Sequence, residues 1–288
     1  MGERSELAGG LPTGVVLRSR KKVWESDRAR LSDERVILEW WHYLLLALAG
    51  AAAGFIDAIA GGGGMISGPA LLWAGLPPQV ALGTNKLQSS CGTLLAVAHY
   101  TRAGLIGWRS LRLAAGITFM AAALGAWAVA IMDPAVLRRI VPALLIAVAI
   151  YTMLNRKLGE RPRAARIGMT AFALIFGTLL GFYDGFFGPG VGSFWMLACV
   201  LTLGQDLRAA TGTTKALNLA SNLAALITFA FAKCLRFDVG IAMIVGQLAG
   251  ARLGSGLVIA HGSRIIRPLF IAVAFTLALR LAWQAFFG

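Results

Sequence analysis

Two aspartates and two lysines stand out because each lies inside a long apolar stretch. Asp57 precedes Lys86, and Asp184 precedes Lys215 at nearly the same distance along the chain. An ionisable side chain inside a membrane-spanning segment is costly and is therefore a candidate for function. A lysine can hold an anion and an aspartate can take up a proton. The alternative is that each lysine only neutralises the aspartate of its own half.

A glycine-rich segment follows each aspartate. The first contains the four consecutive glycines Gly61–Gly64, and the second reads Gly188-Pro189-Gly190. Glycine lets a helix break, and lipid cannot satisfy the backbone N–H groups that a break frees. The broken region must therefore face protein or a wet cavity. A helix that starts at the break directs the positive end of its dipole toward it, which favours an anion.

The alternative for these glycines is that they only permit tight packing between helices. We expect that role for a different set, namely Gly50, Gly54, Gly246, Gly250 and Gly254. A run of four glycines exceeds what a packing seam needs, so Gly61–Gly64 favours the functional interpretation.

Polar side chains recur at helical spacing around both lysines, which places them on one face of each helix. Hydroxyl and amide groups on such a face can bind the oxygens of an oxyanion. We predict a substrate-binding set of Lys86, Lys215, Thr84, Asn85, Ser89, Thr213, Thr214, Asn218, Gly62, Gly63 and Gly190. Asp57 and Asp184 are predicted as proton-coupling or ion-pair residues.

Composition identifies an integral membrane protein. Of the 288 residues, 58% are hydrophobic and 14% charged, and the mean hydropathy is +0.72, which is more apolar surface than a soluble core of this size buries. The net charge is +14, and basic residues cluster in the N-terminal tail and in short connections between apolar segments. That pattern orients a protein in a membrane and does not indicate nucleic-acid binding.

No motif indicates an enzyme. Gly-Thr-Asn-Lys and Gly-Thr-Thr-Lys, which end at Lys86 and Lys215, lack the first glycine of a phosphate-binding loop. The apolar segments hold neither a Ser-His-Asp arrangement nor an HExxH motif, and the three cysteines are scattered. We therefore expect no catalytic residues, no metal and no cofactor.

The apolar segments follow the same order twice. We predict a polar basic tail over 1–39, a first membrane repeat over 40–154, a basic cytoplasmic connection over 155–166 and a second repeat over 167–288. Segments 65–76 and 190–203 are too short to cross a membrane alone, because a spanning helix needs about 20 residues. The other segments are 40–60, 81–101, 110–131, 135–154, 167–187, 208–231, 239–260 and 264–286.

Loop charge separates two possible topologies. If both short segments crossed the membrane, ten spans and inverted halves would result, with the Arg102–Arg112 loop and the N-terminal tail on opposite sides. If the short segments only dip in, eight spans place the tail, the Arg102–Arg112 loop and the Lys233–Arg236 loop inside. The positive-inside rule favours the second topology. We predict an all-α membrane protein with about eight transmembrane helices, two re-entrant half-helices, parallel duplicated halves and cytoplasmic termini.

The paired motifs resemble those of the TauE/SafE family, the sulfite exporters also called toluene-sulfonate uptake permeases. The first half contributes Gly54-Phe55-Ile56-Asp57 through Gly64 and Ala81 through Ser89. The second contributes Gly181 through Gly185, Gly188-Pro189-Gly190 and Gly212-Thr213-Thr214-Lys215. The resemblance covers about residues 40–286, and the tail before residue 40 lies outside it.

The resemblance implies a carrier in a bacterial inner membrane that moves sulfite or small organosulfur anions, coupled to the proton gradient. The resemblance further implies export. Duplicated halves with matched charges and broken helices are typical of secondary transporters, so we expect one anion site between the halves. The partners would be a small anion and the lipid bilayer, and a homo-oligomer is left open. The alternatives are an anion channel and a membrane receptor or scaffold that transports nothing.

Overall fold

The computed structural model describes residues 38–137 and 164–261, and every regular element within them is a helix. The first half contains α2 (Trp40–Ala60), α3 (Gly64–Trp73), α4 (Pro78–Arg102) and α5 (Trp108–Ile131). The second contains α7 (Met169–Phe172), the π-helical turn η1 (Ala173–Gly177), α8 (Thr178–Phe186), α9 (Val191–Thr202), α10 (Leu207–Phe231) and α11 (Phe237–His261). The all-α prediction is confirmed for these residues.

The predicted segments match these helices within a few residues. The predicted short segments 65–76 and 190–203 correspond to α3 and α9, which have 10 and 12 residues. The tail before residue 38, most of segment 135–154 and segment 264–286 lie outside the described residues. The count of eight spans therefore stays a prediction.

Glycine and proline set the ends of α3. Gly61 ends α2 in the left-handed conformation, with φ of 75°, which glycine adopts without a steric penalty. At the other end of α3, Gly75 has φ of 82° and Pro77 precedes α4, which begins at Pro78. Proline is well tolerated at the first position of a helix because its missing N–H would be unpaired there anyway.

The second half uses the same devices around α9. Gly188 and Gly190 have φ of 91° and 80°, so the chain turns sharply between α8 and α9. After α9, Gly204 has φ of 67° and Asp206 caps α10, accepting a hydrogen bond of 2.8 Å from the Ala209 N–H. An aspartate at this position satisfies one of the unpaired N–H groups at a helix start.

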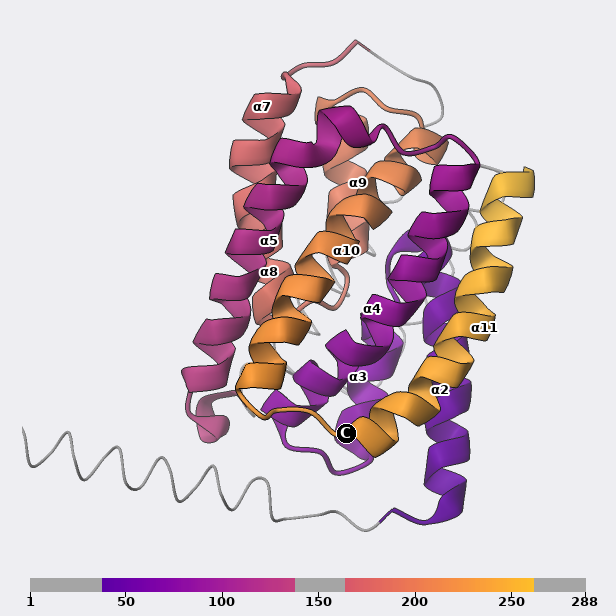
Figure 1. The fold of residues 1–288 in the computed structure, drawn as a ribbon, viewed down its shortest axis with the longest axis vertical. Helices are drawn as coiled ribbons and strands as arrows, with labels where there is room; N and C mark the ends of the chain where they lie inside the picture. Colours follow the sequence, from indigo (N-terminus) through magenta and orange to yellow (C-terminus); the bar gives the residue numbers. More distant parts are fainter. Residues whose placement is uncertain (1–37, 138–163, 262–288) are drawn as a thin grey trace, which may run out of the picture. The chain divides into compact units, whose positions relative to one another are not determined.

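The helices α4 and α10 run in opposite directions. Gly83 near the start of α4 packs against Cys234, just after α10, and Gly212 near the start of α10 packs against Leu105, just after α4. We call the two ends of the bundle the α4-start end and the α10-start end. Figure 1 shows α4 and α10 each running from one end of the bundle to the other, with α5 and α11 on either side.

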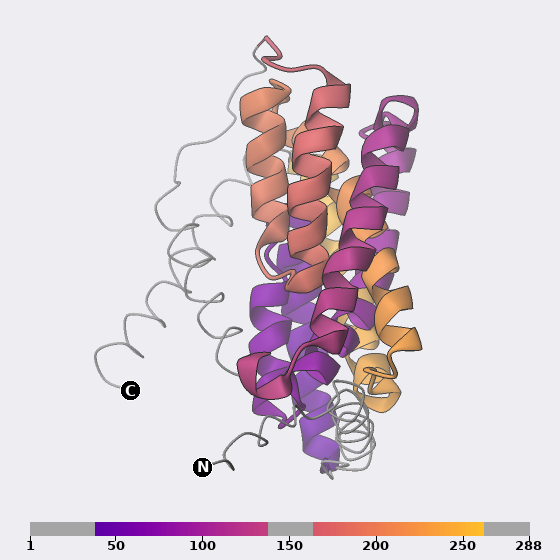
Figure 2. The ribbon, with the colours of Figure 1, turned by 90° about the vertical axis from the view of Figure 1, so that its left-hand side faces the viewer.

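Each short helix belongs to a hairpin that begins and ends at one end of the bundle. Tyr43 near the start of α2 donates a hydrogen bond of 2.8 Å to Asp238 at the start of α11. Since α11 follows the end of α10, this contact places the start of α2 at the α4-start end. The end of α3 lies at the same end, because α3 leads directly into α4. The N–H of Arg166 before α7 donates to the carbonyl of Thr202 at the end of α9. The second hairpin therefore opens at the α10-start end, and Figure 2 shows its turn inside the bundle.

The prediction of parallel halves is wrong. Corresponding helices of the two halves run in opposite directions, because α2 and α3 together return to the end where α2 began. The Arg102–Arg112 loop therefore lies at the α10-start end, whereas Lys233 and Arg236 lie at the α4-start end. Both loops cannot be cytoplasmic, so the prediction of cytoplasmic termini loses one of its supports. Loop charge was a weak guide because it carries no information on how helices pack.

Small residues let two helix pairs pack closely. Gly246 and Gly250 of α11 lie against the backbone of α2 at Ala47 and Ala51, and Gly50 of α2 lies against Met243. In the other half, Gly181 and Gly185 of α8 lie against Thr118 and Ala122 of α5. Such seams are typical of helix pairs in membranes. The packing role expected for Gly50, Gly54, Gly246, Gly250 and Gly254 is confirmed.

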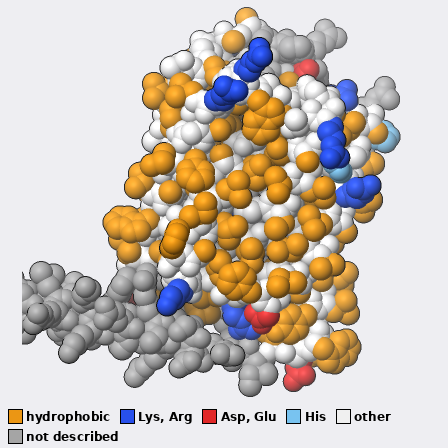
Figure 3. Space-filling view, viewed as in Figure 1, with side chains coloured by type: hydrophobic (Ala, Val, Ile, Leu, Met, Phe, Trp, Pro, Cys, Tyr) orange, Lys and Arg blue, Asp and Glu red, His pale blue; other side chains and the backbone are white. Residues whose placement is uncertain are grey.

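Four of the described helical stretches are long and apolar enough to cross a membrane by length and composition. They are Trp40–Ile59, Trp108–Ile131, Met169–Phe186 and Phe237–His261. On the face drawn in Figure 3, hydrophobic side chains cover the middle, and charged side chains lie toward the two ends. That distribution fits a protein surrounded by lipid.

Replacing Gly250 by Ala should destabilise the protein, whereas Gly256→Ala in the same helix should not. A methyl group at Gly250 would overlap the Ala51 carbonyl oxygen, but at Gly256 it would enter open space. We expect Gly250→Ala to cost about 1–3 kcal/mol through overpacking, while alanine's helix propensity makes Gly256→Ala neutral or stabilising. Thermal unfolding in detergent measures both. Equal melting temperatures would contradict the seam.

Candidate functional site

Lys86 and Asp184 form an ion pair that is almost completely buried. The Lys86 Nζ lies 2.5 Å from Asp184 Oδ1, and the two side chains are 3% and 1% exposed. Lys86 also donates to Asn222 Oδ1 at 3.0 Å. Asp184 Oδ2 accepts a hydrogen bond of 2.7 Å from Asn218 Nδ2 and another from the Ser221 hydroxyl. Both charges are thus held by several partners.

Lys215 and Asp57 form a second ion pair with fewer partners. The Lys215 Nζ lies 2.8 Å from Asp57 Oδ2, and the side chains are 1% and 14% exposed. Among the residues that the structure describes, each is the other's one side-chain hydrogen-bond partner. Lys215 lies about 12 Å from the start of α10, and Lys86 lies as far from the start of α4. Since these helices are antiparallel, the two pairs lie at different depths.

Both ion pairs connect the two halves. Lys86 on α4 reaches Asp184 on α8, and Lys215 on α10 reaches Asp57 on α2. The alternative in which each lysine neutralises the aspartate of its own half is therefore wrong. The sequence matched each lysine with the aspartate that precedes it in the same motif, but the inverted halves bring each one to the opposite partner.

The two helix breaks, one between α2 and α3 and the other between α8 and α9, contact each other inside the bundle. Gly61 at the end of α2 lies against Gly192 in α9, so a side chain on either would collide with the backbone of the other. Gly64 at the start of α3 packs against Pro189. Two tyrosines hold the breaks in place, because Tyr100 donates to the Ala58 carbonyl and Tyr183 donates to the Pro189 carbonyl, both at 2.8 Å.

Each break also borders one ion pair. A Cβ atom placed on Gly188 would lie 2.9 Å from Lys86 Nζ and 3.1 Å from Asp184 Oδ1. A Cβ atom placed on Gly63 would lie 2.6 Å from the Cβ of Asp57. The ion pairs therefore flank the place where the breaks meet, and glycine is required there because no side chain fits.

Among the described residues, backbone N–H groups at this junction are buried or partly buried and unpaired. In the described part of the chain, the N–H groups of Gly62, Gly63 and Gly64 have no hydrogen-bond acceptor, and neither do those of Gly190 and Gly192. Unpaired N–H groups are normal at a helix start and provide donors for an anion. Gly62, Gly63 and Gly190 thus occupy positions compatible with the predicted binding role.

The remaining predicted residues are divided between the junction and other places. Asn85 Oδ1 accepts hydrogen bonds from Ser67, which also donates to the Gly63 carbonyl, and from Gln88. Ser89 accepts a hydrogen bond of 3.2 Å from Gln88. Thr84 instead accepts from the Arg236 N–H, which ties α4 to the loop before α11. Thr213 and Thr214 are buried, and the described hydrogen bonds do not join them to either ion pair.

Ser67 and Gln247 are buried polar residues that the sequence analysis did not single out. Ser67 is fully buried and links the first break to Asn85. Gln247 of α11 is 1% exposed, lies against Gly92, and its Oε1 has no partner among the described residues. A serine three residues after the glycine run, and a glutamine within a largely apolar segment, were the signals that could have found them.

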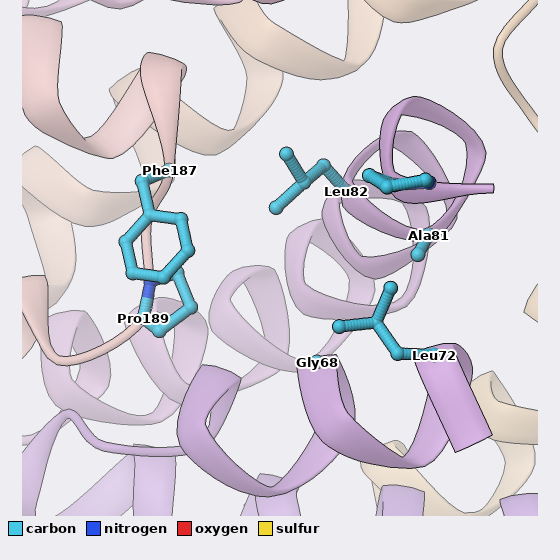
Figure 4. A pocket seen from close by; sticks show the side chains of 7 residues that line it. Gly68, Leu72, Ala81, Leu82, Phe187 and Pro189 are labelled. Atoms are coloured by element: carbon cyan, nitrogen blue, oxygen red, sulfur yellow. The ribbon is translucent and has the colours of Figure 1, made fainter. Parts of the chain in front are cut away.

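An apolar pocket borders the second break at the α4-start end. It is lined by Gly68, Leu72, Pro78, Ala81, Leu82, Phe187 and Pro189, and Figure 4 shows Phe187 and Pro189 facing Leu82 and Leu72 across it. Phe187 and Pro189 flank Gly188, which touches Lys86. Gly188 therefore lies between two residues that line the pocket and close to the Lys86 ion pair.

Residues 46–281, which include both ion pairs and both breaks, match the sequence profile described as Sulfite exporter TauE/SafE. The chain belongs to the TauE/SafE family. Its similar relatives carry the same general description. A "Probable membrane transporter protein" of Haemophilus influenzae is 39% identical over 240 residues, which are 83% of this chain and 94% of the relative.

Two further TauE/SafE relatives extend the comparison. The "Probable membrane transporter protein YfcA" of Escherichia coli K12 is 42% identical over 81% of this chain and 87% of its own. The "Probable membrane transporter protein ORF9" of Sinorhizobium sp is 44% identical over 82% and 90%. No solved structure matches the chain. The protein is thus a multi-pass membrane protein of a transporter family, as the sequence resemblance predicted.

A double-mutant cycle should show that Lys86 and Asp184 are strongly coupled. Lys86→Met or Asp184→Asn alone should cost about 3–5 kcal/mol, because each leaves a buried charge unpaired. The double variant should cost less than the sum of the two by at least about 1 kcal/mol. The more exposed pair Arg236–Asp238 is the control, with an expected coupling of about 0.2–1 kcal/mol. Additive effects at Lys86 and Asp184 would exclude the coupling.

Replacing Gly188 by Ala should destabilise the protein more than Gly104→Ala. Both glycines have positive φ, 91° and 71°, and alanine in that conformation costs about 1–2 kcal/mol. Only at Gly188 does the added methyl group also meet Lys86 and Asp184, since nothing lies near it at Gly104. Thermal unfolding of the two variants separates the two effects. A similar fall in melting temperature in both variants would mean that the Lys86–Asp184 ion pair shifts at little cost to accommodate the methyl group.

Proposed function

We propose that this protein is a secondary transporter that exports sulfite or small organosulfur anions such as sulfonates across a bacterial inner membrane, with coupling to protons. The observation that carries this proposal is the junction of the two breaks, flanked by two buried lysines whose counter-ions come from the opposite halves. The anion site lies at this junction, between the halves.

The donors around the junction suit an oxyanion. A sulfite or sulfonate group has three oxygens, each of which can accept hydrogen bonds from an ammonium group or from backbone N–H groups. Lys86 and Lys215 supply charge, the N–H groups at Gly62, Gly63 and Gly190 supply uncharged donors, and Asn85, Ser89 and Asn218 orient the oxygens. The apolar lining of the pocket beside Pro189 is chemically suited to the organic part of a small sulfonate.

Each ion pair provides a way to couple anion binding to protons. A lysine that is paired with an aspartate is partly neutralised, so its attraction for an anion is weak. Protonation of the aspartate frees the lysine, and an anion can then replace the carboxylate. Asp57 or Asp184 is the proton-responsive group in this scheme.

The inverted halves supply a route for alternating access. One hairpin opens at each end of the bundle, and in many transporters inverted repeats exchange conformations about a site between them. The cross-half ion pairs would change partners or distance in this exchange, since each joins an element of one half to an element of the other. Flux at channel rates without counter-transport would oppose this scheme.

Sulfur oxyanions should raise the melting temperature of the purified protein in detergent, because a ligand that binds the folded state stabilises it. We expect a rise of several degrees with sulfite or a small sulfonate, no rise with a cation of equal ionic strength, and loss of the rise in the Lys86→Gln, Lys215→Gln double variant. Proteoliposome uptake of the same anion tests transport.

Two outcomes would contradict the proposed function. Full anion transport by the double variant would exclude the role of the lysines, and a response limited to a cation or a neutral solute would exclude the substrate class.

A further inference from the structure

We propose that the two ion pairs have different tasks. Lys215 is the lysine that takes the transported anion, and Asp57 is the carboxylate that leaves to admit it. Lys86 and Asp184 form a lasting link between the halves. This division rests on the proposed function, because it assigns the anion site to one of the two lysines.

Both carboxylate oxygens of Asp184 accept hydrogen bonds from side chains. Its Oδ1 accepts from Lys86, and its Oδ2 accepts from Asn218 and Ser221. The residue is 1% exposed, so water cannot replace a lost partner. Removing the carboxylate would deprive Lys86 of its counter-ion and Asn218 of its acceptor in an apolar interior, which is strongly unfavourable.

Asp57 is held much less firmly. Lys215 is its one side-chain partner in the described part of the protein, and it contacts Asp57 Oδ2 alone. Its side chain is 14% exposed, so water can solvate the carboxylate when the ion pair opens. Separation of this pair therefore has a smaller energetic penalty than separation of the other.

Lys215 has unused capacity for a ligand. An ammonium group has three N–H donors, and Asp57 takes one of them among the described residues. The side chain is nevertheless 1% exposed, whereas Lys86, equally buried, has both Asp184 and Asn222 as partners. A buried cation with free donors is a site where an oxyanion with several oxygens can bind.

The difference is visible in the two copies of the motif. Asn218 and Ser221, which hold Asp184, lie three and six residues after Lys215. The residues at the same distances after Lys86 are Ser89 and Gly92. Glycine has no side chain to donate, and the Gln247 side chain occupies the space beside it. The first copy therefore lacks the polar clamp that its counterpart places on an aspartate.

Asp57 then acts as an internal competitor for the anion. When a site is open for only a fraction of the time, its apparent Kd equals its intrinsic Kd divided by that fraction. If the Asp57–Lys215 pair is open about one tenth of the time, removing the carboxylate strengthens anion binding about tenfold. Removing Asp184 should give no such gain, because Lys86 keeps Asn222 as a partner and Gly188 lies beside its ammonium group.

The test compares Asp57→Asn with Asp184→Asn in the purified full-length protein. Binding of sulfite and of methanesulfonate is measured by calorimetry in detergent, with chloride as the control anion. We expect Asp57→Asn to lower the Kd for one sulfur anion about tenfold with a small change in melting temperature. Asp184→Asn should lower the melting temperature more and not strengthen binding. Adding Lys215→Gln to Asp57→Asn should abolish the gain.

A milder variant covers the case in which Asp184→Asn does not fold. Ser221→Ala removes one donor from Asp184 and keeps both charges, so we expect its Kd to stay within about twofold of the natural protein. A lower Kd in Asp184→Asn or Ser221→Ala, similar to that in Asp57→Asn, would overturn the division of tasks.

The remaining outcomes separate this inference from the proposed function. Anion binding by the natural protein with an unchanged or higher Kd in Asp57→Asn would overturn this inference alone. No binding of either sulfur anion by the natural protein and by Asp57→Asn would overturn both this inference and the proposed substrate class.

Discussion

The burial of two positive charges inside an apolar helical bundle is the constraint on which the rest of the structure depends. A lone ammonium group would be prohibitively costly there, so each lysine needs a carboxylate. In this protein the carboxylate comes from the other half of the chain. The need for neutralisation therefore fixes how the halves face each other, and the glycine breaks lie beside the pairs because no larger residue fits.

Much of the local structure could be predicted from the sequence. Apolar length separated the short helices α3 and α9 from the long ones, and glycine and proline marked their ends. The same reasoning identified Asp57, Lys86, Asp184 and Lys215, because charge within an apolar stretch is rare. It also predicted packing by glycines such as Gly250, whereas Gly61 of the run Gly61–Gly64 turned out to pack closely as well. These features depend on residues close together in sequence.

The pairing of the charges and the direction of the halves could not be predicted in this way. Both depend on contacts between distant segments, such as Gly83 with Cys234 and Lys86 with Asp184. The loop-charge rule concerns the ends of helices and is blind to a hairpin that turns back inside the bundle. Ser67 and Gln247 escaped notice because the sequence marks a single polar residue in an apolar helix, but only packing shows what that residue faces.

The contact between Gly61 and Gly192 has a consequence for how the molecule can move. Each backbone occupies the space that a side chain of the other would need, so the turn of one hairpin is a wall of the other. Displacing either turn removes the support of its neighbour. The two hairpins therefore cannot move independently, because their turns together form one barrier across the bundle. A pathway open to both sides of the membrane at once would require the two turns to separate at Gly61 and Gly192.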